Sequence, residues 1–149
     1  MRSRRDDVDV RATVDRARKL NLCGFGGVLT PPPSDLRSAL VRADEQYDER
    51  VARRIARFAD VVVGSLAWTR GGDGLFWLGR LEGPYFYDAG GAAVDLVHVR
   101  RCRWLSTPLL ERDVPAAVVA TFRRGGRNFQ QTHDPDVGAQ SQRLWDERG

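Results

Sequence analysis

Residues 61–83 read VVVGSLAWTRGGDGLFWLGRLEG, and this stretch decides the fold. Its two arms are rich in β-branched and aromatic residues that alternate with a period of two, and a glycine-rich turn at 71–74 separates them. The stretch therefore predicts a β-hairpin. Both arms are apolar on both faces in places, which is typical of a strand in the centre of a sheet or in a small barrel. We therefore expect a closed or strongly curved sheet.

Helices are predicted on the amino-terminal side of this hairpin. Apolar residues recur at helical spacing through residues 34–60, and the pattern is interrupted near Tyr47 and Asp48, so two short helices or one broken helix are expected there. Ser34, which follows three prolines, is the predicted N-cap. A further helix is predicted at residues 12–20.

More strands are expected around the hairpin. Residues 22–25 predict a short strand, the run DLVHVRRCRW at 95–104 predicts a second, and residues 128–132 predict a last one. The apolar run that follows Pro115 is of uncertain type, and residues 139–145 predict a terminal helix. This order predicts an α+β fold in which a small curved, barrel-like, mainly antiparallel sheet is flanked by helices.

Length and composition limit the classes of protein to which this chain can belong. With 149 residues, 42% of them hydrophobic, the chain fits a single domain over residues 1–149 with a core of its own. It has neither an apolar run of the roughly 20 residues that a membrane span needs nor the apolar stretch of a signal peptide. Cys23 and Cys102 are the only cysteines, and without a secretory context they indicate buried thiols in a cytoplasmic protein.

Charge is unevenly distributed along the sequence. The net charge is +4, and Lys19 is the sole lysine among the 24 basic residues. Residues 100–127 carry seven arginines against two acidic residues. Arginine presents a planar fork that suits phosphates and base edges, so this excess favours nucleic acid as a partner.

Catalytic and cofactor motifs are absent from the sequence. His98 and His133 are far apart, and no Gly-x-Ser-x-Gly, Walker or HExxH pattern occurs. The segment Gly24–Gly27 has no following lysine and leads into prolines, which argues against a phosphate-cradling loop. We expect no enzyme activity, no cofactor and no metal site, and a structural role for His98 in its predicted strand.

Aromatic residues beside arginines are the stronger signal. Trp68–Arg70, Tyr85–Tyr87 and Arg100–Trp104 all fall on predicted strands. Flat rings can stack on extruded or single-stranded bases while guanidinium groups hold the phosphates. The pattern predicts a module that binds DNA or RNA.

Three runs together resemble a known family. They are RFADVVVGSLAWTRGGDGLFWLGRLEGPYFYD, DLVHVRRCRW and FQQTHDPDVGAQSQRLW. Their order resembles bacterial domains of the PUA-like superfamily, close to the EVE-like branch, over residues 20–145. Ser65 stands where that pattern prefers aspartate, and the first strand of the family is shortened or absent before Asp6.

The resemblance implies a curved sheet with an aromatic-lined pocket that accepts a modified nucleobase by base flipping. Phe25 matches the aromatic residue at the mouth of that pocket, and Trp68 matches that of the Trp-Thr strand. We therefore expect a non-catalytic reader of a modified base, in a defence or modification-dependent system. The predicted base-pocket residues are Phe25, Trp68, Thr69, Tyr85 and Trp104.

Phosphate contacts are expected from the arginines near this pocket and from the positive segment. The predicted contacts are Arg70, Arg100, Arg101, Arg123 and Arg127.

Two other functions remain open at this point. Tryptophan, tyrosine and arginine are also the residues of interface hot spots, so the aromatic hairpin could dock a partner protein as an interaction subunit. A nuclease that uses His98 or His133 with Arg100 is the third hypothesis.

Overall fold

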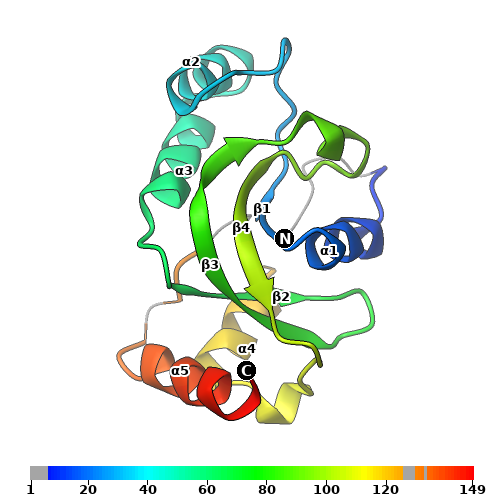
Figure 1. The fold of residues 1–149 in the computed structure, drawn as a ribbon, viewed down its shortest axis with the longest axis vertical. Coiled ribbons are helices and arrows are strands. Elements are labelled where there is room, and N and C mark those ends of the chain that lie inside the picture. Colours follow the sequence, from blue (N-terminus) through cyan, green and yellow to red (C-terminus); the bar gives the residue numbers. More distant parts are fainter. Residues whose placement is uncertain (1–6, 126–129, 133) are drawn as a thin grey trace.

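The computed structural model describes residues 7–125, 130–132 and 134–149, and it has the predicted α+β fold (Figure 1). Four antiparallel strands form one sheet in the order β1-β4-β3-β2. The strands are β1 (Leu22–Phe25), β2 (Leu66–Arg70), β3 (Phe76–Tyr87) and β4 (His98–Trp104). β1 and β2 are the two edges, so the sheet is curved but not closed into a barrel.

Helices surround this sheet (Figure 1). The α-helices are α1 (Val10–Lys19), α2 (Leu36–Gln46), α3 (Glu49–Asp60), α4 (Ala116–Arg123) and α5 (Val137–Arg148). Two short 3₁₀ helices, η1 (Ala89–Val94) and η2 (Glu111–Asp113), lie in the connections. No helix within the described ranges has the length and apolar character needed to cross a membrane.

The predicted hairpin is formed by β2 and β3. Its register pairs Leu66 with Arg80 at one end and Arg70 with Phe76 at the other. β3 continues past Gly83, where the sequence pattern ended the arm, to Tyr87. A bulge between Leu81 and Tyr85 shifts its register with β4. A bulge is one of the places where a strand tolerates proline, and Pro84 occupies it.

The break between the two predicted helices is confirmed. Asp48 caps α3, since its carboxylate accepts a hydrogen bond of 2.9 Å from the amide of Val51. The predicted N-cap of α2 is one residue off. Asp35, not Ser34, caps this helix, because its carboxylate accepts from the amide of Ser38, whose hydroxyl closes the reciprocal bond of a capping box.

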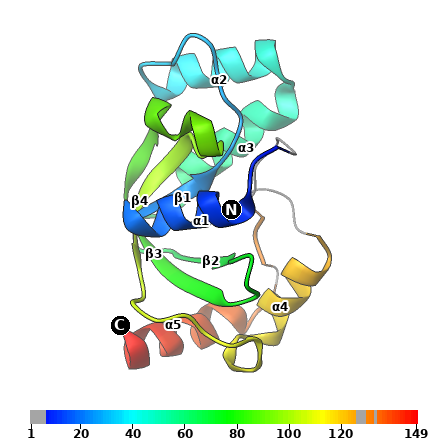
Figure 2. The same ribbon diagram turned by 90° about the vertical axis from the view of Figure 1, so that its right-hand side faces the viewer.

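Two large apolar clusters pack against different parts of the curved sheet. Phe76 and Leu78 of β3 pack with α4 and α5, where Trp145 is 4% exposed. Phe25 packs with α2 and α3. Figure 2 shows the result, with α2 and α3 at one end of the sheet and α4 and α5 at the other.

The carboxy-terminal third differs most from expectation. The apolar run after Pro115 forms α4, and α5 is longer than the predicted helix at 139–145. Residues 130–132, which belong to the last predicted strand, are not in a strand, while residues 128 and 129 lie outside the described part of the chain.

Candidate functional site

A cleft of about 1170 Å³ extends from the end of α3 to α4 and α5. Both edge strands line it, with residues 23–25 of β1 and 66–70 of β2. The end of α3, the α4 residues Val118, Thr121 and Phe122, and the first turns of α5 complete the walls. Because the sheet curves, its two edges face one shared space.

Aromatic side chains form one part of this cleft. Trp68 is half-buried, and its indole Nε1 donates a hydrogen bond of 3.0 Å to Ser141 Oγ on α5. Phe25 is 1% exposed and packs edge-on against Phe58 of α3, with ring centroids 5.1 Å apart. Both aromatic residues that the resemblance singled out therefore line one cleft, but Trp68 alone of the two offers accessible ring surface, because Phe25 is buried in the wall.

The polar lining of the cleft is mostly neutral. Hydroxyl and amide side chains line it, including those of Ser65, Thr69, Thr132, Gln130, Gln131 and Gln142. Among the described lining residues, the charged ones are Arg70 and Asp73, both near the hairpin turn. Such a lining offers donors and acceptors with little net charge.

Arg70 is the predicted phosphate contact that lies at the cleft. Its guanidinium carbon lies 5.5 Å from the ring centroid of Phe76, and its Nε is buried without a hydrogen-bond partner among the described residues. An unpaired buried donor costs free energy, which an acceptor from a ligand could recover.

Tyr85 does not line the cleft, in contrast to the prediction. Its hydroxyl lies 2.9 Å from Nδ1 of His98, whose Nε2 lies 2.8 Å from the carbonyl oxygen of Gly27. Since a carbonyl only accepts, the His98 proton is on Nε2 and Tyr85 donates to Nδ1. Burial lowers the pKa of His98 to about 4 and raises the pKa of Tyr85, so both are neutral. This agrees with a structural role for His98.

The same network fixes the backbone that follows β1. Asp95 Oδ1 accepts a hydrogen bond of 2.9 Å from the amide of Gly27, while His98 holds the Gly27 carbonyl. A Cβ on Gly26 would lie 2.2 Å from the Asp95 carboxylate, so a side chain cannot be accommodated there. The turn therefore holds the end of β1, and with it Phe25, against the cleft.

Arg100 is buried, in contrast to the prediction that it contacts phosphate. It is 1% exposed, and its guanidinium donates to the backbone carbonyls of Gly83, Phe58 and Val61 at 2.8, 2.9 and 2.6 Å. These bonds join β3, β4 and the end of α3. Burial also lowers the pKa of Arg100.

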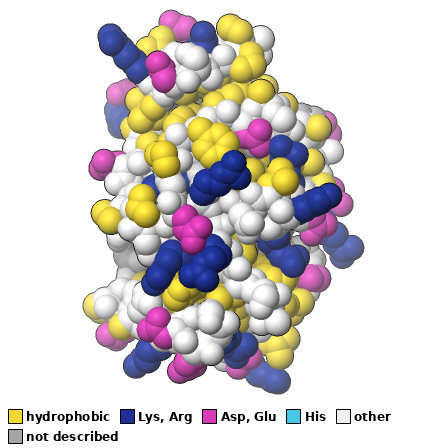
Figure 3. All heavy atoms as spheres, viewed as in Figure 1, with side chains coloured by type: hydrophobic (Ala, Val, Ile, Leu, Met, Phe, Trp, Pro, Cys, Tyr) yellow, Lys and Arg dark blue, Asp and Glu magenta, His cyan; other side chains and the backbone are white. Residues whose placement is uncertain are grey.

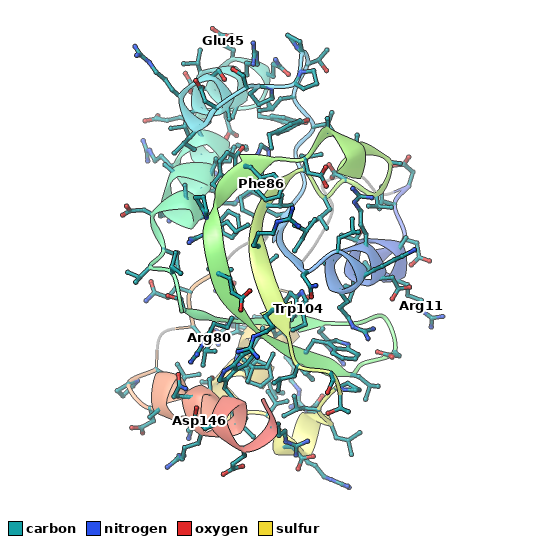
Figure 4. All side chains as sticks on the ribbon, viewed as in Figure 1. Arg11, Glu45, Arg80, Phe86, Trp104 and Asp146 are labelled. Carbon is teal, nitrogen blue, oxygen red and sulfur yellow. The ribbon has the colours of Figure 1, made fainter. Side chains whose placement is uncertain are left out.

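The other predicted residues are dispersed. Trp104 lies away from the cleft and donates from Nε1 to the carbonyl of Leu22 at 2.9 Å (Figure 4). Thr69 lines the cleft but is 1% exposed. Arg101 is exposed on β4, and Arg123 is exposed on α4, where it forms an ion pair with Glu111. Arg127 and His133 lie outside the described residues.

Sequence reasoning missed the contribution of the carboxy-terminal helices. Ser141 and Gln142 of α5 and Thr121 and Phe122 of α4 line the cleft. The run that resembles the family at its carboxy-terminal end, which includes Ser141 and Gln142, was the signal that could have identified the α5 residues.

Two free cysteines lie on neighbouring strands, Cys23 on β1 and Cys102 on β4. The prediction of a buried thiol is confirmed for Cys102. Cys23 is only half-buried and lines the cleft. A hydrogen bond from the Cys102 thiol lowers the pKa of Cys23.

Comparison with known proteins gives no relative. No family model, no curated protein and no solved structure matches the chain.

Proposed function

We propose that this protein is a non-catalytic nucleic-acid-binding module that accepts one extruded or single-stranded base in the cleft. The observation that carries the proposal is the half-buried ring of Trp68 in the wall of a half-open cleft that both edges of the sheet line. Trp68 is held in place by Ser141, so the stacking surface exists before a ligand binds.

The chemistry of the lining supports a nucleobase as the occupant. A base is a neutral heterocycle with donors and acceptors on its edge, and the amides of Gln130 and Gln131 and the hydroxyls of Ser65 and Thr132 can pair with both kinds. A strongly anionic ligand would need more positive charge than Arg70 supplies beside Asp73. The cleft exceeds the upper range of small-molecule pockets, roughly 1,000 Å³, so a nucleotide has room.

The energy balance of such binding is favourable only with help from phosphates. Extruding a base from a duplex costs a few kcal/mol, and stacking on an aromatic ring returns about 1 to 3 kcal/mol. Arg70, at the hairpin end of the cleft, is the nearest described cation that can contact the flanking backbone. A mispaired, damaged or already unpaired base costs less to extrude, which favours such a base as the target.

The finer assignments are part of this proposal. They are a PUA-like, EVE-like domain whose sheet is barrel-like, a modified base in DNA or RNA as the ligand, and a cytoplasmic defence or modification-dependent system as its setting. The curved sheet with helices at both ends supports the fold assignment.

A protein-docking hairpin is less well supported. Phe76 and Trp77 in the second arm are 1% and 6% exposed, and the Trp68 indole is bonded to α5. These rings pack within the molecule, so the hairpin presents few aromatic anchors to a partner.

A binding screen tests the proposal. The purified chain is titrated with oligonucleotides that carry methylated and hypermodified bases, at about 50 and 200 mM salt. Trp68→Ala should bind the preferred oligonucleotide roughly 5- to 150-fold more weakly, because the stacking energy is lost. Trp104→Ala removes an equal side chain away from the cleft and should bind like the parent. A folded Trp68→Ala protein with the parent's affinity would refute the base-binding cleft.

A further inference from the structure

The outer face of β3 and β4 carries a group of arginines that the cleft does not use. Arg101 and Arg103 are exposed on β4, and Arg80 is half-buried on β3. Arg101 and Arg103 are two residues apart on one strand, so they share a face of the sheet. Arg80 pairs with Arg103 across the strands and therefore lies on the same face. Figure 3 shows dark blue side chains gathered over the middle of this face. We call these three residues the arginine face.

Two of these arginines share one aromatic ring. The guanidinium carbons of Arg80 and Arg103 lie 5.1 and 4.8 Å from the ring centroid of Trp145. Like charges directly opposite each other in a sheet repel, so this arrangement needs compensation. The ring face supplies part of it, because a guanidinium is attracted to the π electrons of tryptophan. Stacking also orients the guanidinium plane and leaves its N–H edge available.

Negative charge on this face is insufficient to neutralise the arginines. Arg103 donates from Nε to Glu82 at 3.1 Å, and this pair is half-exposed. Arg80 donates from Nη2 to the amide oxygen of Gln142 at 3.1 Å, and its Nε is buried with no partner among the described residues. Arg101 lies over Phe86 at 5.3 Å and donates to a backbone carbonyl. Within the described residues, Glu82 is the one acidic side chain bonded to any of these three arginines, and it bonds to Arg103 alone.

The arginine face lies next to the cleft. Gln142, which accepts the hydrogen bond from Arg80, also lines the cleft, and so does Leu66, the strand partner of Arg80. In Figure 4, Arg80 lies at the α5 end of β3, whereas Phe86, the ring under Arg101, lies towards the other end. A ligand that enters the cleft beside Gln142 can therefore extend over these arginines.

We infer that Arg80, Arg101 and Arg103 form a phosphate-binding surface for the backbone of the nucleic acid whose base enters the cleft. The inference rests on the proposed function for the identity of the polymer. Arginine forks match phosphate oxygens with paired N–H bonds. Arg101 and Arg103 are two residues apart on β4, roughly 7 Å, so each can take a separate phosphate. The surface replaces Arg100, which is buried, as the main phosphate contact.

The first experiment measures phosphate binding directly. Inorganic phosphate is titrated into ¹⁵N-labelled protein, and the arginine Nε–Hε signals are followed by NMR. The signals of Arg80 and Arg103 should shift and saturate, and those of Arg80 should shift less in Arg103→Gln. The exposed Arg53, which is paired with Glu49 on α3, is the internal control and should not shift. Unchanged Arg80 and Arg103 signals would overturn the inference.

The second experiment asks whether the phosphate belongs to a nucleic acid. The affinity for a single-stranded oligonucleotide is measured against salt for the parent, Arg103→Gln, Arg101→Gln and the control Arg53→Gln. Each variant of the arginine face should lower the slope of log affinity against log salt by about 0.7, the value for one lost contact to a single strand. Arg53→Gln should keep the slope of the parent.

The outcomes separate this inference from the proposed function. If the oligonucleotide binds and Arg103→Gln and Arg101→Gln keep the parent's slope, the arginine face is refuted while the base-binding cleft stands. If no oligonucleotide binds although phosphate shifts Arg80 and Arg103, the proposed function fails, and the backbone is refuted as the source of the phosphate. Shifts caused by an acidic peptide and not by phosphate would also overturn the inference.

Discussion

The indole Nε1 of Trp68 donates a hydrogen bond of 3.0 Å to the hydroxyl of Ser141, and this bond ties the edge strand β2 to helix α5. The two residues are 73 positions apart in the sequence. Through this bond a helix from the end of the chain becomes a wall of the cleft and sets the orientation of its main stacking ring. Under the proposed function, stability and ligand binding are therefore coupled at this contact.

Ser141→Ala should weaken both properties. The Trp68 donor loses its partner in a half-buried position, which costs about 1 to 2 kcal/mol of unfolding free energy. Urea denaturation measures this loss. Oligonucleotide affinity should also fall, because the indole is free to rotate. If Ser141→Ala unfolds at the parent's urea concentration and binds equally well, the bond has no role in shaping the cleft.

Acid should destabilise the protein through His98. Its pKa is about 4 in the folded state and about 6.5 in the unfolded chain, so the unfolded state binds more protons between these values. Unfolding free energy should consequently fall as the pH drops from about 6.5 to about 4, by up to roughly 3 kcal/mol, and His98 should contribute no slope above pH 7. Denaturant titrations across this range measure the effect.

His98→Gln is the matched control for this pH dependence. Glutamine keeps a side-chain N–H for the Gly27 carbonyl but does not titrate in this range. The variant should be less stable than the parent at pH 7 and should lose most of the slope between pH 6.5 and pH 4. A slope equal to the parent's would assign the acid sensitivity to other groups.

Arg100→Leu should damage the fold and leave phosphate recognition unaffected. The substitution leaves the carbonyls of Gly83, Phe58 and Val61 without their donor, which costs about 3 kcal/mol or more. Thermal or urea unfolding measures the loss. In the folded fraction the salt dependence of oligonucleotide binding should equal that of the parent. A stable variant with a reduced salt slope would restore Arg100 as a phosphate contact.

Gly24→Ala tests how closely β1 approaches β4. A Cβ at this position would lie 1.9 Å from the backbone oxygen of His98, so the strands must separate and stability should fall by several kcal/mol. Gly138→Ala is the control, because its Cβ would meet no atom within 4 Å and alanine favours helix. Its stability should be equal or higher by up to about 1 kcal/mol. Equal stability of the two variants would contradict the close approach.

The elements of this fold that local pattern determines could be predicted from the sequence. The hairpin, the strand at 22–25 and the break at Asp48 depend on alternation, turn residues and caps within a few positions. Ser34 and Asp35 are both favourable N-cap residues, so the sequence pattern does not decide between them. In the structure Asp35 has the extended backbone from which its carboxylate reaches the amide of Ser38.

The candidate site could be predicted only in part, because it depends on which face of each strand is covered. Period two places Arg100 and Arg101 on opposite faces, but it does not say which face receives the helices. α2 and α3 cover the side of Arg100, so the neighbouring arginine remains exposed. Tyr85 and Trp104 likewise bond to residues of other strands, His98 of β4 and Leu22 of β1, and these partners cannot be read from the local pattern.

The most direct test of the base-binding cleft is to introduce an aromatic side chain that occupies it. Gly138→Phe places a ring on α5 at the cleft wall, where a Cβ meets nothing within 4 Å, so the variant should fold. Val41→Phe adds a ring to the exposed face of α2, outside the cleft, as the control. The measurement is the dissociation constant for the preferred modified oligonucleotide. The base-binding cleft predicts that Gly138→Phe binds at least about tenfold more weakly, a loss of about 1.4 kcal/mol, while Val41→Phe binds like the parent. Folded Gly138→Phe with the parent's dissociation constant would contradict it.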